Sequence, residues 1–276
     1  MLNGRDMRKL SHMLPFRLLC LFLLIGSWVD AQYAESIRSG RPGQSIGPYV
    51  TGTNIFQVQS GLSYSEASIP DVELNATDFN TVLRFGLSEY FEINGAITYA
   101  WLEEVSGGGL GSRADEVLNA NGITQAELGV RTNIYNSQSN FPSIGFQYRL
   151  KFPSPTEEFR TDHNTSIITL VTQQNIGKLG LLTNWGIDWV GNTGEEVGFY
   201  IINLSTGLSD NLGIFVEQYG FFNNGEWLGK FDGGLAILVN NDLQLDLFGG
   251  WGSLGQNEDS FFVSTGVSWR TSRKKK

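Results

Sequence analysis

Residues 77–101 alternate between apolar and polar side chains in two arms, and this alternation constrains the fold more than any other feature of the sequence. In the first arm, Phe79, Leu83 and Phe85 share one face of an extended chain. After a break at residues 88–89 the alternation resumes. Successive strand side chains point to opposite faces, so each arm has one apolar and one polar face. Each arm is about ten residues long, the length that a tilted strand needs to cross a bilayer. The segment therefore predicts a membrane-spanning β-hairpin.

The rest of the chain repeats this unit. Its mean hydropathy of -0.13 is too low for a bundle of membrane helices, whereas 34 glycines and 12% aromatic residues suit strands that face lipid on one side and water on the other. We predict an all-β, twelve-stranded antiparallel transmembrane β-barrel of outer-membrane type, with short periplasmic turns and long extracellular loops. The expected strands are residues 53–64, 77–87, 90–102, 123–135, 143–152, 165–174, 179–190, 197–208, 212–222, 230–239, 243–251 and 261–270.

The sequence divides into four expected regions. Residues 1–31 resemble a secretory signal, because a basic region and an apolar run precede the small-residue site at Ala31. A retained membrane anchor and a lipoprotein attached through Cys20 are the alternatives. Residues 32–52 form a polar periplasmic lead or a lumen plug, residues 53–270 form the barrel, and residues 271–276 form a basic periplasmic tail.

Charge and cysteine content exclude several functions. Removing the signal takes away four basic and two acidic residues, which leaves 15 basic and 26 acidic residues and a formal charge of -11. An acidic exported protein does not suit nucleic acid. Cys20 is the only cysteine and leaves with the signal, so we expect no disulfide. No phosphate-binding glycine loop, zinc pattern or calcium loop occurs, so we expect no cofactor and no metal.

The positions of charged residues favour a barrel over a soluble sandwich. On the expected strands every charge falls on the inward face, because a lipid-facing Arg or Lys at mid-depth costs about 2–4 kcal/mol. The predicted lumen charges are Arg84, Glu92, Glu127, Arg131, Arg149, Lys151, Asp188, Glu217, Lys230, Asp232 and Asp246, together with Asp78 and Arg270. They form either a structural ladder of opposite charges or a selectivity region.

Aromatic residues gather where strands should leave the membrane. The predicted girdle comprises Tyr64, Trp101, Phe152, Trp189, Trp251 and Trp269, with Phe221 or Phe222 on the ninth strand. In contrast, a few apolar residues would point inward: Ile167, Phe199, Ile201, Phe215 and Tyr219. Either the lumen has an apolar lining there or the predicted register slips.

The long loops are expected to be acidic. They would carry fifteen acidic residues: Glu66, Asp71, Glu73, Glu103, Glu104, Asp115, Glu116, Glu157, Glu158, Asp162, Glu195, Glu196, Glu226, Glu258 and Asp259. Three interpretations stand: a solvated surface, a cation-attracting mouth, or carboxylates bridged by divalent ions to lipopolysaccharide.

His163 is the one histidine of the mature chain and could indicate a barrel that hydrolyses lipids. Such an enzyme needs a serine within hydrogen-bonding reach of the histidine. No serine lies at a persuasive spacing, and His163 falls in a loop rather than on the outer face of a strand. We therefore expect no catalytic residues and no enzyme.

Short motifs resemble a known family. Residues 38–48 (RSGRPGQSIGP) and 56–64 (FQVQSGLSY) are similar to the opening of a bacterial outer-membrane family named for the meta-cleavage pathway of phenol degradation, whose members are called transporters. Weaker similarities follow at residues 83–87, 215–220 and 266–269. Relatives commonly have an Asp and a Glu where Gly43 and Gln59 stand here. The resemblance implies an outer-membrane barrel with a transport function.

Together these features predict an outer-membrane, porin-like passive transporter for small, including apolar or aromatic, solutes. Arg38 and Arg41 are the plug candidates, folding back against inward acids such as Glu127 or Glu217. The expected partners are outer-membrane lipids and lipopolysaccharide, the barrel-assembly machinery and a small-molecule solute, with Trp269 read by that machinery. The alternatives are a non-conducting surface or adhesion barrel and, less favoured, a lipid hydrolase.

Overall fold

The protein is described by a computed structural model covering residues 34–69, 72–106, 116–137, 141–191, 195–223, 226–253 and 259–272. The chain divides into a unit of residues 1–32 and a unit of residues 33–276, and every described residue belongs to the second. The predicted signal (1–31) and most of the basic tail (273–276) lie outside the described residues.

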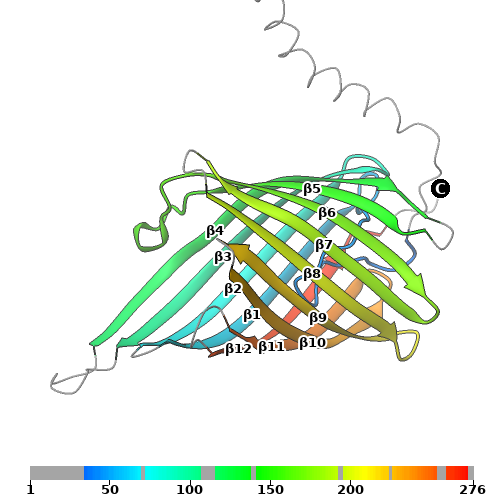
Figure 1. Cartoon of the computed structure of the whole chain (residues 1–276). Coiled ribbons are helices and arrows are strands. Elements are labelled where there is room, and N and C mark those ends of the chain that lie inside the picture. Colours follow the sequence, from blue (N-terminus) through cyan, green and yellow to red (C-terminus); the bar gives the residue numbers. More distant parts are fainter. Residues whose placement is uncertain are drawn as a thin grey trace, which may run out of the picture. The chain divides into compact units, whose positions relative to one another are not determined.

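Twelve strands form one closed barrel (Figure 1). They are β1 (Phe56–Ile69), β2 (Val72–Gly86), β3 (Phe91–Ser106), β4 (Glu116–Tyr135), β5 (Ser143–Phe152), β6 (Thr165–Ile176), β7 (Leu179–Val190), β8 (Glu195–Gly207), β9 (Leu212–Asn223), β10 (Glu226–Asn240), β11 (Leu243–Gly252) and β12 (Asp259–Arg270). A short 3-10 helix, η2 (Glu157–Phe159), follows β5. None of the described residues forms a helix long and apolar enough to cross a membrane.

Every strand pairs antiparallel with its neighbours in the chain, and β1 closes the ring by pairing with β12. This last ladder runs from Gln57 opposite Arg270 to Ser68 opposite Asp259. Closure leaves the ring of strands without an open edge, as lipid requires of a spanning sheet. The predicted fold class is confirmed.

The two faces of the barrel differ as the alternation predicted. Leu83 is 45% exposed, whereas the next residue, Arg84, is 2% exposed. The same contrast separates outward apolar residues from inward polar ones around the ring. Tyr64, Trp101 and Trp189 are exposed on the outer face at the same end of their strands. Trp251 and the half-buried Phe152 of the predicted girdle end their strands at this rim too, whereas Trp269 lies at the opposite rim.

The strands extend further than the sequence indicated, so the picture of fifteen acids in loops was wrong. Nine of them lie within strands: Glu66, Glu73, Glu103, Glu104, Glu116, Glu195, Glu196, Glu226 and Asp259. Glu157 and Glu158 are in η2, Asp162 is in the connection after it, and Asp71, Asp115 and Glu258 lie outside the described residues. Polar composition suggested loops, but Ser65 to Ile69 still pair with Val72 to Ala76, so the ladder continues past the aromatic girdle.

The apolar residues expected to point inward do so, and the register does not slip. Ile167 and Phe215 are buried, and by strand alternation they share the inward face with Thr169 and Glu217. The lumen therefore has an apolar stretch. Its rings include Phe248, whose centroid lies 6.2 Å from that of Phe215 and 5.6 Å from that of Phe262.

Candidate functional site

The lumen contains both the charged side chains of the strands and residues 34–55, here called the N-terminal segment. All eleven charges named for the lumen occupy inward strand positions: Arg84, Glu92, Glu127, Arg131, Arg149, Lys151, Asp188, Glu217, Lys230, Asp232 and Asp246. Some form ion pairs across neighbouring strands. Arg84 Nε lies 2.7 Å from Glu92 Oε1, and Arg149 Nη1 lies 2.8 Å from Glu127 Oε2.

The N-terminal segment begins at the rim that carries the β6–β7 and β10–β11 turns, here called the short-turn rim. Arg270 at the end of β12 donates from Nη2 to the carbonyl oxygens of Ala34 and Glu35, at 3.1 and 2.7 Å. The N–H of Ile37 donates to the carbonyl oxygen of Asn241 in the β10–β11 turn, at 2.7 Å. These bonds fix where the segment enters the barrel.

Asp242 in the same turn holds Arg270 in place. Its Oδ1 lies 2.8 Å from Arg270 Nε, and Ser272 Oγ donates to its Oδ2 at 2.5 Å. Burial alone would raise the pKa of the Asp242 carboxyl, but the bonds from Ser272 and Arg270 outweigh it, so the pKa is lowered from its ordinary value.

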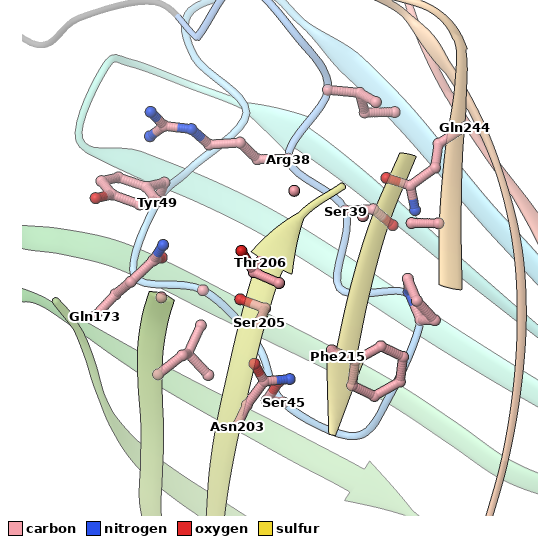
Figure 2. A pocket seen from close by; sticks show the side chains of 18 of the residues that line it. Arg38, Ser39, Ser45, Tyr49, Gln173, Asn203, Ser205, Thr206, Phe215 and Gln244 are labelled. Carbon is pink, nitrogen blue, oxygen red and sulfur yellow. The ribbon is translucent and has the colours of Figure 1, made fainter. Parts of the chain in front are cut away.

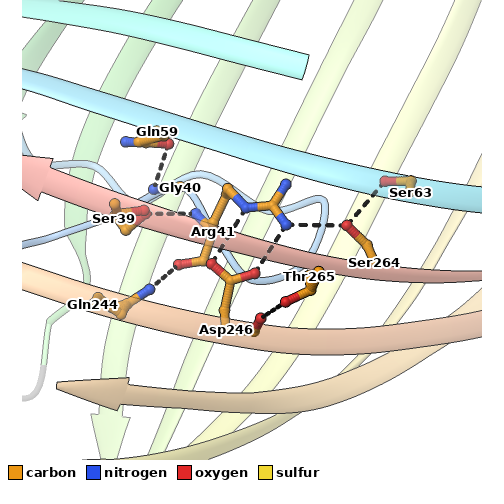
Figure 3. A network of polar contacts seen from close by, with 10 residues as sticks. Ser39, Gly40, Arg41, Gln59, Ser63, Gln244, Asp246, Ser264 and Thr265 are labelled. Atoms are coloured by element: carbon orange, nitrogen blue, oxygen red, sulfur yellow. Dashed lines mark hydrogen bonds and ion pairs between the residues drawn. The ribbon is translucent and has the colours of Figure 1, made fainter. Parts of the chain in front are cut away.

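Arg41 ties the segment to β11 and β12 (Figure 3). Its Nη2 and Nε reach Asp246 Oδ1 and Oδ2 at 2.9 and 3.3 Å, and Nη2 also donates to Ser264 Oγ at 3.0 Å. Gln244 Nε2 donates to the carbonyl oxygen of Arg41 at 2.7 Å. The Asp246 side chain is fully buried, so this pair compensates a carboxylate that water does not reach.

Glu217 of β9 anchors the next stretch through the backbone. Its carboxylate accepts from the N–H groups of Gln44 and Ser45, at 2.6 and 3.1 Å, and from the Ser45 hydroxyl. Asn203 of β8 donates to the same carboxylate at 2.6 Å. Arg41 therefore does pair with an inward acid, as predicted, but that acid is Asp246 rather than Glu127 or Glu217. Glu217 binds backbone N–H groups instead.

Asparagines hold the middle of the segment. Asn184 of β7 bonds both backbone groups of Ile46, accepting from its N–H at 2.8 Å and donating to its C=O at 2.9 Å. Asn133 of β4 donates to the carbonyl oxygen of Pro48 at 3.0 Å. This backbone has no strand neighbour, so amide side chains supply the partners that buried N–H and C=O groups need.

The Arg84–Glu92 pair of β2 and β3 also bonds backbone groups of the segment. Arg84 donates to the carbonyl oxygens of Arg38 and Tyr49 at 2.9 and 3.1 Å, and Glu92 accepts from the N–H of Thr51 at 2.9 Å. The segment thus runs around the inside of the barrel and contacts strands on all sides of it.

Glycines on the wall make room for the segment. Gly61 and Gly266 face each other on β1 and β12, and a Cβ atom at either would overlap the Arg41 guanidinium. A Cβ atom at Gly145 of β5 would lie 2.7 Å from backbone atoms of Pro48. Sequence reasoning missed these glycines and the asparagines; the signal available was small and amide residues at inward positions.

A cavity of about 570 Å³ lies between the N-terminal segment and the wall formed mainly by β6–β9. Figure 2 shows Arg38 and Tyr49 of the segment and Asn203 and Phe215 of the wall around it. Lys178 of the β6–β7 turn also lines it, which places one end of the cavity at the short-turn rim. The segment therefore leaves space beside it.

The other chemistry that the sequence raised finds no support in the described part of the chain. There, no serine or acid hydrogen-bonds the His163 imidazole, and no group of three His, Cys, Asp or Glu could hold a metal ion. Thr161 donates to the His163 backbone carbonyl only.

No protein-family model matches the chain, and no curated protein matches it. Among solved structures, the chain is similar to an outer-membrane channel from Pseudomonas putida F1, with 10% identity and a TM-score of 0.61 over 84% of this chain and 99% of that one. At this identity the likeness shows the fold alone, that of an outer-membrane β-barrel.

Two further structures score lower. The translocator domain of the autotransporter NalP from Neisseria meningitidis has 14% identity and a TM-score of 0.49 over 80% of this chain and 89% of that one. The KdgM porin has 9% identity and a TM-score of 0.49 over 76% and 98%. Neither carries an argument about function, and the resemblance to the phenol-degradation family stays a prediction.

Proposed function

We propose that this outer-membrane barrel is a passive channel for small solutes, and that its N-terminal segment narrows the lumen. One observation carries the proposal: the segment circles the wall, held by side chains of at least seven strands, yet leaves a cavity of about 570 Å³ beside it. A barrel that served only as a scaffold would need neither the wall glycines that make room for the segment nor the cavity beside it.

The apolar stretch of the lumen supports a finer proposal about the solute. Phe215, Phe248 and Phe262 offer ring faces and edges on one wall, and charged side chains occupy others. Apolar and aromatic solutes gain free energy from such rings, at about 0.5–1.5 kcal/mol per favourable ring pair beyond area burial. We propose that the channel carries small solutes with an apolar or aromatic body. We also propose that the protein belongs to the phenol-degradation family that its motifs resemble.

The remaining assignments are proposals of the same kind. Residues 1–31 direct export, outer-membrane lipids and lipopolysaccharide surround the barrel, and the assembly machinery reads Trp269. The protein is not an enzyme; a lipid-ester assay on the His163→Ala variant and the wild type tests this, and hydrolysis that this substitution abolishes would contradict it.

A deletion of residues 32–51 that retains the export signal tests the channel. We expect planar-bilayer conductance to rise, because the deletion removes the chain that occupies the lumen. Unchanged conductance would refute a narrowing role of the segment. Liposome swelling with small sugars and alcohols separates a channel from a non-conducting surface barrel: no swelling with either protein would favour the surface barrel.

A further inference from the structure

The cavity beside the N-terminal segment has side-chain charges of one sign. Its lining includes Arg38, Arg84, Arg131 and Lys178, and no acidic residue lines it within the described ranges. The whole chain, by contrast, has 28 acidic and 19 basic residues. Such a concentration of cations in an acidic protein calls for a physical reason.

One carboxylate behind the lining compensates part of this charge. Glu92, with 0% exposure, accepts two bonds from Arg84 at 2.7 and 2.8 Å. Arg131 lies close enough to interact with Glu92 electrostatically, but no ion pair joins them. The negative charge of one carboxylate thus offsets part of the positive charge of two guanidinium groups.

Arg131 retains unused donors. It is 5% exposed, and its guanidinium makes one hydrogen bond within the described residues, from Nη2 to Gln147 Oε1 at 3.3 Å. Its Nε is buried without an acceptor. A buried guanidinium with few partners is costly, and Arg131 lines the cavity, so an anion there would offer acceptors to its remaining donors.

Arg38 and Lys178 add two charges that no carboxylate of the described chain pairs with. The Arg38 guanidinium carbon lies 3.7 Å from the centroid of the Tyr49 ring. Lys178 is exposed in the β6–β7 turn and lines the cavity at the short-turn rim. The cavity therefore has a cation at the short-turn rim and others within.

The uncharged part of the lining indicates what the remainder of a bound anion would contact. Phe215, Leu182 and Ile37 provide apolar surface, and Gln173 and Ser205 provide polar groups. We infer that this cavity binds small organic anions, with the carboxylate held by Arg38 and Arg131 and an apolar body against Phe215. Guanidinium groups suit this task because their forked donors match a carboxylate.

Binding can be measured without transport. The mature full-length protein in detergent is titrated by calorimetry with benzoate and with benzamide, which has a similar shape and no charge. We expect benzamide to bind at least about tenfold more weakly than benzoate, because it lacks the charge-assisted bonds. Equal binding of the two, or binding of neither, would overturn the inference.

The variant Arg38→Gln/Lys178→Gln tests the residues. The backbone carbonyls of both residues accept from Arg84 and Thr206, and these bonds remain after substitution. The side-chain contact that the variant removes is that of Arg38 with the Tyr49 ring. We expect the preference for benzoate to fall by about tenfold or more. Arg160→Gln, in the exposed β5–β6 connection, is the matched control and should keep it. A double variant that binds benzoate as the wild type does would refute the assignment.

One further test rests on the proposed channel. If the channel conducts, a narrow part lined by positive charges should favour anions that pass through it. In a potassium chloride gradient across a planar bilayer, the wild-type reversal potential should indicate a preference for chloride, which Arg38→Gln/Lys178→Gln lowers and Arg160→Gln does not. A wild-type preference for potassium would contradict the inference. A barrel without any conductance would refute the channel instead, while benzoate binding in detergent still decides the anion site.

Discussion

Replacing Arg41 with methionine should release the N-terminal segment from the wall. Every hydrogen bond that the Asp246 carboxylate makes within the described residues comes from Arg41. The Asp246 side chain has 0% exposure and that of Arg41 has 12%, so the substitution leaves a buried carboxylate without a counter-charge. Breaking such a pair from one side costs about 3–5 kcal/mol. We take the lower end, because water can enter the lumen once the segment moves.

Amide hydrogen exchange measures this release directly. At tenfold per 1.4 kcal/mol, a loss of about 3 kcal/mol raises the opening equilibrium of the segment about a hundredfold. Peptides covering residues 39–47 should therefore exchange about a hundredfold faster in the Arg41→Met protein, while peptides from the paired strands keep their protection. The measurement is mass spectrometry on protein in detergent micelles or nanodiscs.

The double variant Arg41→Met/Asp246→Asn provides the decisive comparison. Asparagine removes the uncompensated charge at nearly constant volume, so exchange should return much of the way to the wild-type rate. Arg160→Met, which removes an exposed arginine, should leave exchange unchanged. If Arg41→Met exchanges like the wild type, or if the double variant opens as readily as the single one, the reasoning about a buried ion pair is wrong.

Three further predictions concern the wall and the rim. Leu83→Arg should lower barrel stability in refolding titrations with lipid vesicles, with the mid-depth cost of about 2–4 kcal/mol as the upper bound. Val82→Arg, one residue along on the inward face, should not lower it; equal losses would contradict the assigned faces. Gly145→Val should speed exchange of the N-terminal segment, because its Cβ would lie 2.7 Å from segment backbone, while Gly213→Ala, whose nearest neighbour would be 3.8 Å away, should leave exchange unaltered. Because the pKa of Asp242 is lowered on folding, the stabilisation by its carboxylate is present above the unfolded pKa and lost as the pH falls through the folded one. Wild type and Asp242→Asn should therefore differ in thermal stability at pH 7, begin to converge as the pH falls below about 4, and meet below the folded pKa; a constant difference across that range would refute the linkage.

The alternation of residues was sufficient to predict the barrel. Charged side chains are costly in lipid, and large apolar surfaces are costly in water. Every strand with lipid on one face and the lumen on the other therefore alternates apolar and polar residues. Leu83 and Arg84 show how sharp this signal is, with 45% and 2% exposure at adjacent positions. The strand ends were harder to predict, because past the girdle both faces meet water and alternation no longer reports pairing.

The site was less predictable, because the N-terminal segment is held by groups that leave no pattern. Arg41 was a reasonable candidate for an inward ion pair, but several acids occupied inward positions, and only the path of the backbone selects Asp246. Glu217 and Asn184 bind main-chain groups, which every residue carries, so nothing in the sequence of the segment identifies their partners.

A cysteine pair tests most directly the central claim that the N-terminal segment lines the inside of the barrel. Ser39 Oγ and Ser268 Oγ lie 2.6 Å apart, and the mature chain has no cysteine if the predicted signal is removed. We expect Ser39→Cys/Ser268→Cys protein, isolated from outer membranes under oxidising conditions, to react with a maleimide-polyethylene glycol reagent only after reduction. Two thiols that react freely before any reductant is added, at the rate of the single Ser39→Cys variant, would contradict it.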